Sequence, residues 1–462
     1  MAPRALLIGL DCAPPSLVFE RWADHLPHLS ALRARGRWGP LRSCMPPITV
    51  PAWTCMVSGR DPGELGLYGF RNRPRDRGYD LRVASAKDVK VKRVWDRLGE
   101  AGHTAAALFV PLSWPPTPLR GWMVSGFLTP DAAKPWAFPR ALKAELEARF
   151  GPYRVDVADF RGGDLARVFD ELHAMTAQHF AMARHVWTEK RPGFLMMVEM
   201  GPDRLHHAAW QHLDPAAPGY VPGNPWEARA RGYYAALDAE IGRLLAETDE
   251  ETLVLVASDH GARAMEGAVA VNEVLRRAGW LVLREEPREP TRLREVIDWG
   301  RTKAWGEGGY YARIFLNVAG REPAGALPAS EAEAARDAIA ALLEEAGPAG
   351  TRVWRPEALY GTVRGQPPDL LAVFADLAWR AEGSVGHASA LLEGEAIRGP
   401  AGSKLDGANH AWDGIGIVAG PGVTPGRWEG AELWDVGRTV LEAFGVEAGA
   451  GWRGRDLRSA GR

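Results

Sequence analysis

The chain has 462 residues, 46% of them hydrophobic, and its 56 basic and 58 acidic side chains leave a formal net charge of −2. This length exceeds that of most single domains, so it predicts one large α/β unit with insertions, or two domains. Because acids and bases are interspersed, we expect no basic surface for a nucleic-acid polymer or an anionic membrane, whereas a small anionic substrate stays possible.

The cysteines and the apolar runs indicate a reducing compartment, the cytoplasm. Cys12, Cys44 and Cys55 have no paired spacing, which argues against a disulfide framework or a thiolate zinc site and favours a reducing environment. The first apolar run, residues 5–10, is too short for a signal sequence, and no other run reaches the length of a transmembrane helix. We therefore expect a cytoplasmic protein outside the membrane, with an oligomeric state that the sequence leaves open.

The first quarter of the chain alternates apolar strands with short helices. Residues 4–10 predict a buried strand of the parallel type, ending at Asp11, where functional groups of such sheets gather. A helix at 29–34 that stops at Gly36, a strand at 38–43 and a helix at 51–57 follow. Residues 60–90 lack a sustained period, so we expect a long excursion over the surface.

The same alternation continues in the rest of the chain. We predict strands at 103–110, 121–127, 193–200, 252–257, 369–374 and 415–419, and helices at 91–101, 140–150, 165–190, 225–247 and 431–444. The strand at 369–374 is expected to return to the core. Residues 267–365 contain helix and strand fragments with Pro/Gly-rich turns, which suggests an insertion.

Thr49 is the candidate nucleophile. Pro51 favours a first helical turn, which places Thr49 at or just before a helix N-terminus. A hydroxyl there faces unpaired backbone N–H groups and the positive end of the helix dipole, an arrangement that binds phosphate and favours an alkoxide. The alternative is an ordinary N-cap, the usual role of such a threonine. As a nucleophile, Thr49 would need activation by a base or a metal.

Acidic and histidine side chains follow three predicted strands, beginning with Asp11. Asp203 and His207 are four residues apart and share one face of a helical turn, so they can bind one metal ion. Asp259 and His260 are adjacent, so we expect their side chains to diverge. Oxygen and imidazole ligands without thiolate suit Zn²⁺, with Mn²⁺ or Mg²⁺ as alternatives, and two such ions could activate a nucleophile and hold a phosphoryl group.

A further histidine completes the set. His410 is preferred over His387 because Asp413, Gly414 and a buried strand follow it directly. His206 breaks the four-residue spacing and is expected to be an ordinary polar residue.

These motifs, in their order, resemble those of the alkaline phosphatase superfamily, and are most similar to its type I phosphodiesterase/nucleotide pyrophosphatase branch. The matching stretches are Leu7-Ile8-Gly9-Leu10-Asp11, Pro47-Ile48-Thr49-Val50-Pro51-Ala52-Trp53, Pro202-Asp203 through His207, Ser258-Asp259-His260-Gly261 and His410. The resemblance covers residues 4–60, 193–261 and 405–445. It implies an α/β three-layer sandwich with a mostly parallel central sheet, formed by one catalytic domain over residues 1–462 with inserted cap segments at 60–190 and 267–400.

The resemblance also implies a phosphoric ester hydrolase with two divalent metal ions. Asp11, Thr49, Asp259 and His260 would surround one ion, and Asp203, His207 and His410 the other. Thr49 would attack phosphorus to give a phosphothreonine that water then releases. A small phosphate ester is the expected substrate, a diester or pyrophosphate rather than a monoester. The alternatives are a phosphomutase or phosphotransferase, and a non-catalytic metal-binding member.

One position departs from the family pattern. Nucleotide pyrophosphatases typically carry an asparagine shortly after the nucleophile, where its amide helps to hold a phosphate oxygen, and here Ala52 stands at that position. The Val50 N–H or Arg71 could supply the missing donor. The departure argues against nucleotide substrates but not against phosphoryl chemistry. Trp53 is interpreted as an apolar helix residue beside the core, with stacking on a substrate as the alternative.

Overall fold

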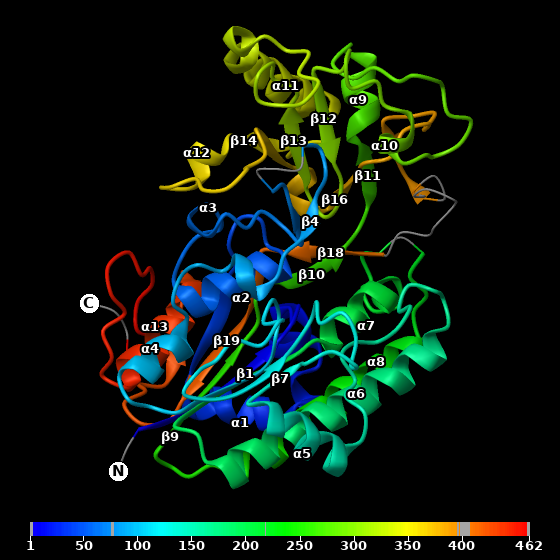
Figure 1. Cartoon of the computed structure of the whole chain (residues 1–462). Helices are drawn as coiled ribbons and strands as arrows, with labels where there is room; N and C mark the ends of the chain where they lie inside the picture. Colours follow the sequence, from blue (N-terminus) through cyan, green and yellow to red (C-terminus); the bar gives the residue numbers. More distant parts are fainter. Residues whose placement is uncertain (1–2, 75–77, 218, 395–396, 398–406, 460–462) are drawn as a thin grey trace.

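The computed structural model describes residues 3–74, 78–217, 219–394, 397 and 407–459 (Figure 1). Its largest sheet has the order β20-β2-β19-β9-β1-β8-β5-β6-β7, with β21 beside β2. The neighbours β9, β1, β8, β5 and β6 all run parallel, which confirms the predicted sheet. The strands are β1 (Arg4–Leu10), β2 (Arg37–Arg42), β5 (Ala105–Val110), β6 (Gly121–Ser125), β7 (Ala137–Phe138), β8 (Phe194–Glu199), β9 (Thr252–Ala257), β19 (Asp413–Ala419), β20 (Gly426–Arg427) and β21 (Ala431–Glu432).

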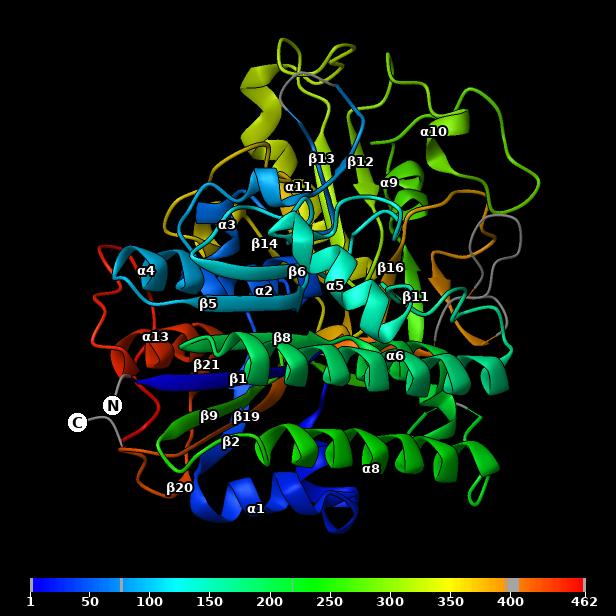
Figure 2. The same ribbon diagram turned by 60° about the horizontal axis from the view of Figure 1, so that its bottom comes forward.

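Helices cover both faces of this sheet (Figures 1 and 2). Helices α2 (Thr49–Ser58), α4 (Val94–Glu100) and α13 (Leu433–Ala443) lie on one face. Helices α1 (Pro27–Arg35), α6 (Leu165–His185) and α8 (Pro225–Leu245) lie on the other. Because both faces are covered, every residue of β8 and β9 is buried, which explains their continuous apolar sequences. The predicted three-layer α/β sandwich is therefore confirmed.

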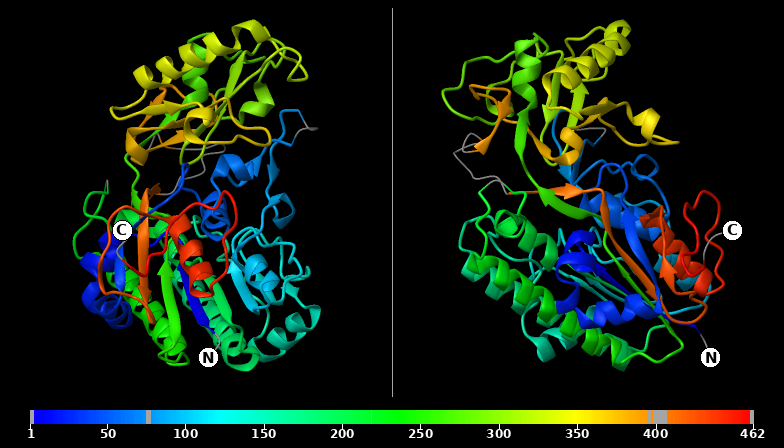
Figure 3. Two further views of the ribbon diagram at one scale, coloured as in Figure 1. Left: turned by 90° about the vertical axis from the view of Figure 1, so that its left-hand side faces the viewer. Right: turned by 180° about the vertical axis from the view of Figure 1, so that it is seen from behind.

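Residues 267–392 form a second unit, called the cap below, which lies at the top of both views in Figure 3. Its antiparallel sheet has the order β12 (Ala304–Glu307), β13 (Ala312–Leu316), β15 (Leu370–Val373) and β14 (Arg352–Trp354). Helices α9 (Val271–Arg277) and α11 (Ala332–Ala346) pack on it around a hydrophobic cluster separate from the main core. A smaller sheet joins β11 (Gly267–Ala270) to β16 (Trp379–Glu382) and β17 (Leu391–Leu392).

The prediction that the strand at 369–374 returns to the core is wrong. This strand is β15, and it pairs with β13 and β14 of the cap. A short apolar run is equally well buried in either sheet, and its sequence does not say which partner strands it will meet. The link between cap and core is instead a two-stranded ladder of β10 (Gly261–Ala264) and β18 (Ala408–Ala411).

The first expected insertion, residues 60–190, lies partly outside the central sheet and partly within it. It contains α3 (Pro62–Leu65), β3 (Arg71–Asn72) and β4 (Arg82–Val83), and later α5 (Arg140–Phe150), whose bounds match the prediction. Within it, however, β5 and β6 belong to the central sheet. Residues 75–77 of this insertion, and residues 395–396 and 398–400 of the second, lie outside the described residues. The division into one domain with two insertions stays a prediction.

None of the described helices combines the length and the hydropathy needed to cross a bilayer.

Close packing of α2 on β1 depends on Gly9. A Cβ atom at this position would lie 2.5 Å from Cη2 of Trp53 and 2.9 Å from Cγ2 of Val198. Both neighbours are fully buried, so neither can move without disturbing the core. The absence of a side chain at Gly9 therefore lets the indole of Trp53 lie directly on the strand.

We expect Gly9→Ala to lower the free energy of unfolding by about 1–3 kcal/mol, because the added methyl group overpacks this contact. Gly232→Ala is the matched control. Gly232 lies in α8 with open space around its Cα, so alanine should leave stability unchanged or raise it by up to about 1 kcal/mol. Thermal and urea unfolding followed by circular dichroism measure both variants, and equal stabilities would contradict the packing interpretation.

Candidate metal and nucleophile site

The parallel strands bring the candidate acidic residues to one edge of the sheet. In register, Leu10 of β1 lies beside Glu199 of β8, and Gly9 lies beside Ala257 of β9. The residues that follow these strands therefore emerge next to one another, as open parallel sheets require of functional groups at their carboxyl ends. All the sequence-predicted site residues meet there, each at most 3% exposed: Asp11, Thr49, Asp203, His207, Asp259, His260 and His410.

The first group consists of Asp11, Asp259 and His260, whose donor atoms lie within 4.8 Å of one another. Nε2 of His260 lies 3.3 Å from Oδ2 of Asp259 and 3.7 Å from Oδ1 of Asp11. Thr49 joins this group, since its Oγ1 lies 3.4 Å from the same nitrogen. The expectation that the side chains of Asp259 and His260 diverge is wrong, because the chain bends at Asp259 between β9 and β10.

The second group consists of Asp203, His207 and His410, of which Asp203 and His410 also place donor atoms within 4.8 Å of His260. Asp203 and His207 lie on α7 (Gly201–Ala209), with Nε2 of His207 3.2 Å from Oδ1 of Asp203, so the shared helical face is confirmed. Nε2 of His410 lies 3.3 Å from Nε2 of His207 and 4.0 Å from Oδ1 of Asp203. His410 lies within β18 and pairs with Ala262. Its ring stacks on that of His260 at 3.8 Å, which joins the two groups.

The two other histidines that the sequence raised have separate environments. His387 lies in the cap, where its Nε2 is 2.8 Å from the Ser384 hydroxyl. His206 is fully buried on α7, and its Nε2 lies 3.0 Å from the hydroxyl of Tyr234. Among the described residues, neither of them belongs to a group of three that places its donor atoms within 4.8 Å of one another.

Three buried carboxylate oxygens point into the site without a hydrogen-bond partner among the described residues: Asp11 Oδ1, Asp203 Oδ1 and Asp259 Oδ2. Each is the oxygen that faces the imidazoles. A buried charged oxygen without a partner is costly, and a divalent cation compensates that cost directly. With oxygen and imidazole nitrogen as the only donors, the two groups fit divalent cations such as Zn²⁺.

The remaining oxygen of each carboxylate is held by the protein. Trp53 Nε1 donates to Oδ2 of Asp11 at 2.6 Å, the Cys12 N–H donates to Oδ1 of Asp259 at 3.2 Å, and the Arg204 guanidinium donates to Oδ2 of Asp203. Arg204 in turn donates to both oxygens of Asp156, at 2.6 and 2.7 Å. These contacts fix which oxygen of each carboxylate is presented to the site.

The imidazoles are oriented in the same way. Nδ1 of His410 lies 2.8 Å from the Pro47 carbonyl, and Nδ1 of His260 lies 3.1 Å from the Gly261 carbonyl. A carbonyl can only accept, so each Nδ1 carries the proton and each Nε2 presents its lone pair to the site.

Burial sets the protonation of these groups. It lowers the pKa of His260 to about 4 and that of His410 well below its usual value, so both are neutral, as ligands must be. Burial and the neighbouring carboxylates raise the pKa of Asp11 and Asp259 well above the usual value. Burial acts to raise the pKa of Asp203 as well, but His207 and Arg204 hold it well below its usual value. Among the described residues, no positive charge is enough to offset the raised pKa of Asp11 and Asp259, and a bound cation would supply the missing charge.

The roles of three residues at this site were missed in the sequence. Trp53 lies in the core, as its sequence predicts, and its indole N–H also holds Asp11. Its spacing of four from Thr49, which puts both on one face of α2, was an available signal. Arg204 adjoins Asp203 and was passed over. Tyr310 of the cap has its hydroxyl 3.1 Å from Nε2 of His207, and no motif or spacing in the sequence indicates this contact.

Comparison with known proteins gives one family and several solved structures. The family profile described as type I phosphodiesterase/nucleotide pyrophosphatase matches residues 5–412. No protein with a curated description matches the chain. Murine ectonucleotide pyrophosphatase/phosphodiesterase 5, in an inactive form with AMP, is 12% identical over 96% of both chains with a TM-score of 0.58. The human protein is 14% identical over 98% of this chain and 97% of its own, with a TM-score of 0.59.

A bacterial hydrolase has the same fold. Phosphonoacetate hydrolase from Sinorhizobium meliloti, in complex with phosphonoacetate, is 15% identical over 96% of both chains and has a TM-score of 0.63. At these identities the structural likeness establishes the α/β fold and nothing finer.

The hydrogen bond from Trp53 to Asp11 predicts a measurable effect on metal binding. We expect Trp53→Phe to weaken zinc affinity by about 10–100-fold, because Asp11 loses the donor that orients it. Trp95→Phe is the matched control, since Trp95 is equally buried but its Nε1 has no hydrogen-bond partner among the described residues. Competition titration against a chromogenic chelator gives both affinities. Unchanged affinity in Trp53→Phe would show that Asp11 is not a ligand.

Proposed function

The chain belongs to the type I phosphodiesterase/nucleotide pyrophosphatase family of phosphoric ester hydrolases, and we propose that it cleaves phosphate diesters or pyrophosphates with Thr49 as nucleophile. The observation that carries the proposal is the set of three carboxylate oxygens without a hydrogen-bond partner among the described residues, which face the site imidazoles beside the Thr49 hydroxyl. We propose two zinc ions in this site, one held by Asp11, Thr49, Asp259 and His260 and the other by Asp203, His207 and His410.

The position of Thr49 suits attack on phosphorus. It is the first residue of α2, and a helix start leaves its first N–H groups without intrahelical partners. The N–H of Val50, in the same turn, can therefore donate to a phosphoryl oxygen, as anion sites at helix starts do. The cations, when bound, supply the charge that favours the Thr49 alkoxide and hold phosphoryl oxygens. The burial of all these side chains keeps competing water away from the nucleophile.

Two adjoining pockets, the smaller of which is lined by Ile48 next to Thr49, offer room for the groups that flank phosphorus. The first, of about 420 Å³, contains Ile48 and Tyr310. The second, of about 680 Å³, shares Val83, Phe127 and Leu128 with it. Volumes of this size accommodate ligands much larger than phosphate. Extended substrates such as diesters and pyrophosphates therefore fit the site better than small monoesters.

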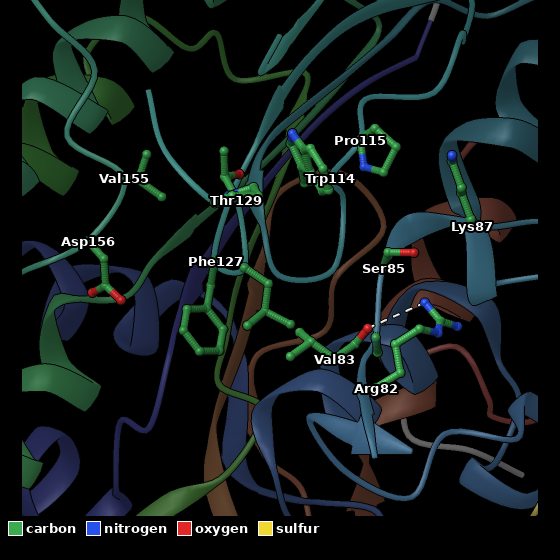
Figure 4. Close-up of a pocket in the computed structure, with 13 residues that line it drawn as sticks. Arg82, Val83, Ser85, Lys87, Trp114, Pro115, Phe127, Thr129, Val155 and Asp156 are labelled. Carbon is green, nitrogen blue, oxygen red and sulfur yellow. Dashed lines mark hydrogen bonds between the residues drawn. The ribbon is translucent and has the colours of Figure 1, made fainter. Parts of the chain in front are cut away.

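The larger pocket combines apolar walls with one cationic rim (Figure 4). Asp156 and Val155 lie on one side, Ser85 and Lys87 on the other, and Phe127 between them. Asp156 is bound to Arg204, which holds Asp203, so this wall connects the pocket to the candidate metal site. The Lys87 ammonium suits a second anionic group, such as the outer phosphate of a pyrophosphate. Arg71 lines the smaller pocket and stays the candidate for a further phosphate donor.

The alternative functions share this site and differ in later steps. A phosphomutase or phosphotransferase would form the same phosphothreonine but pass the group to an alcohol, so products formed with an acceptor alcohol present would separate it from a hydrolase. A non-catalytic member would bind metal without turnover on phosphate esters or phosphonoacetate. We also propose that the protein works in the cytoplasm, because its three cysteines are all free and buried.

Removing the nucleophile tests the proposal. We expect Thr49→Ala to lower kcat/KM for bis-p-nitrophenyl phosphate by at least about 10³-fold, since Thr49 supplies the oxygen that forms the proposed intermediate. Thr54→Ala is the control on the same helix, where the hydroxyl only donates to the Val50 carbonyl. Chelation by EDTA should abolish wild-type activity, and added zinc should restore it. Turnover that survives either EDTA or the loss of Thr49 would refute the proposed function.

Blocking the junction of the two pockets tests the substrate class. Val83 is 44% exposed and lines both pockets, so Val83→Trp should lower kcat/KM for bis-p-nitrophenyl phosphate by roughly tenfold, as expected when an ester group loses its apolar site. Methyl p-nitrophenyl phosphate, which does not reach the junction, should react as before. Val221→Trp, at a valine 62% exposed and outside both pockets, is the control. Equal losses on both esters would argue against the pockets as substrate sites.

A further inference from the structure

The cap places one of its own side chains against the candidate metal site. The loop between β12 and β13 carries Gly308, Gly309 and Tyr310 toward the core. A Cβ atom at Gly308 would lie 2.6 Å from the Gly383 nitrogen, and Gly309 has a φ of 143°, which side chains rarely allow. This loop can therefore pass so close to its neighbours only because it begins with two glycines.

Ring contacts hold Tyr310 in place. Its ring stacks on that of His410 with centroids 3.9 Å apart and an interplanar angle of 25°. His410 stacks in turn on His260, so three rings form one column beside the site. The phenol oxygen lies 3.1 Å from Nε2 of His207, the atom that also faces Asp203 and His410. Tyr310 thus contacts two members of the second group, His207 and His410, from the side of the site that faces the cap.

The Tyr310 hydroxyl lies between two side chains. Nη2 of Arg161, in the connection between α5 and α6, lies 3.0 Å from the phenol oxygen, and Nε2 of His207 lies 3.1 Å from it. A guanidinium can only donate, so the phenol oxygen accepts from Arg161, and the O–H is the donor that Tyr310 itself presents at the second group.

The position of Thr49 relative to Tyr310 indicates which substrate oxygen this hydroxyl would meet. The nucleophile lies with the first group, 3.4 Å from His260, whereas Tyr310 lies with the second. In phosphoryl transfer the attacking and departing oxygens lie roughly in line on opposite sides of phosphorus. A hydroxyl that lies with the second group rather than beside Thr49 is therefore suited to meet the departing oxygen. Negative charge develops on that oxygen, and donors aimed at developing charge lower the barrier.

We propose that Tyr310 is a catalytic residue, whose O–H donates a hydrogen bond to the departing ester oxygen. This inference rests on the proposed function and deepens it, since it assigns a role to the cap in the chemical step. No proton needs to leave the phenol, because the hydrogen bond itself stabilises the developing charge. The need for this donor grows with the basicity of the departing oxygen.

The test is a series of methyl phosphate diesters whose leaving groups range from p-nitrophenol through phenol to a simple alcohol. Tyr310→Phe keeps the ring stack and removes only the hydroxyl. We expect it to lower kcat/KM by about 100-fold for phenol and alcohol leaving groups, and by less than about 3-fold for p-nitrophenol. The slope of log kcat/KM against leaving-group pKa should steepen. Tyr79→Phe is the matched control, because the Tyr79 hydroxyl donates to the Asn317 side chain and Tyr79 lines neither pocket.

Three results would overturn the inference, and they can be told apart. Equal losses for every leaving group would mean that Tyr310 only supports the structure. A tenfold or greater fall in zinc affinity of Tyr310→Phe, measured by chelator competition without substrate, would make the phenol a metal ligand instead. No turnover of any ester by the wild-type enzyme would remove the proposed function, and this role of Tyr310 with it. Unchanged zinc affinity with a steeper slope supports the inference.

Discussion

Three buried carboxylates that crowd one edge of the central sheet impose the constraint on which the rest of this molecule depends. Asp11, Asp203 and Asp259 each leave one oxygen without a hydrogen-bond partner among the described residues. Burial and mutual repulsion raise the pKa of Asp11 and Asp259, so the site is electrostatically incomplete without added positive charge. A fold selected only for stability would avoid such a cluster, because each uncompensated buried charge costs free energy. The cluster is best understood as a place for cations.

The surrounding structure orients this cluster. Each carboxylate has its second oxygen held by a neighbour, through Trp53, Arg204 or the Cys12 backbone. Each of His260 and His410 is turned by a backbone carbonyl so that Nε2 faces inward. These contacts come from different elements, and a shift in any of them would misdirect a donor atom. The tight packing of Trp53 on Gly9 therefore serves the site as well as the core.

The cap decides what the site can accept. It joins the core through a small apolar cluster in which Tyr311 of the cap packs near Ile48, the residue before Thr49. Its loop at 308–311 lines the smaller pocket and brings Tyr310 to His207. The core thus supplies the candidate nucleophile and the candidate cation ligands. In the proposed function the cap supplies contacts to the groups around phosphorus, and this division would allow one core chemistry to serve different substrates.

The sequence alone determined the α/β class, the parallel strands and the identity of the candidate site residues, because these depend on short-range patterns. The apolar runs of β1 and β9 predict both strands at their observed bounds, and the spacing of Asp203 and His207 predicts their shared helical face. Tertiary structure alone decided the convergence of Asp259 and His260, the place of β15 in the cap, and the approach of Tyr310 to His207. Each of these depends on a bend or on pairing between distant segments, which local periodicity does not encode.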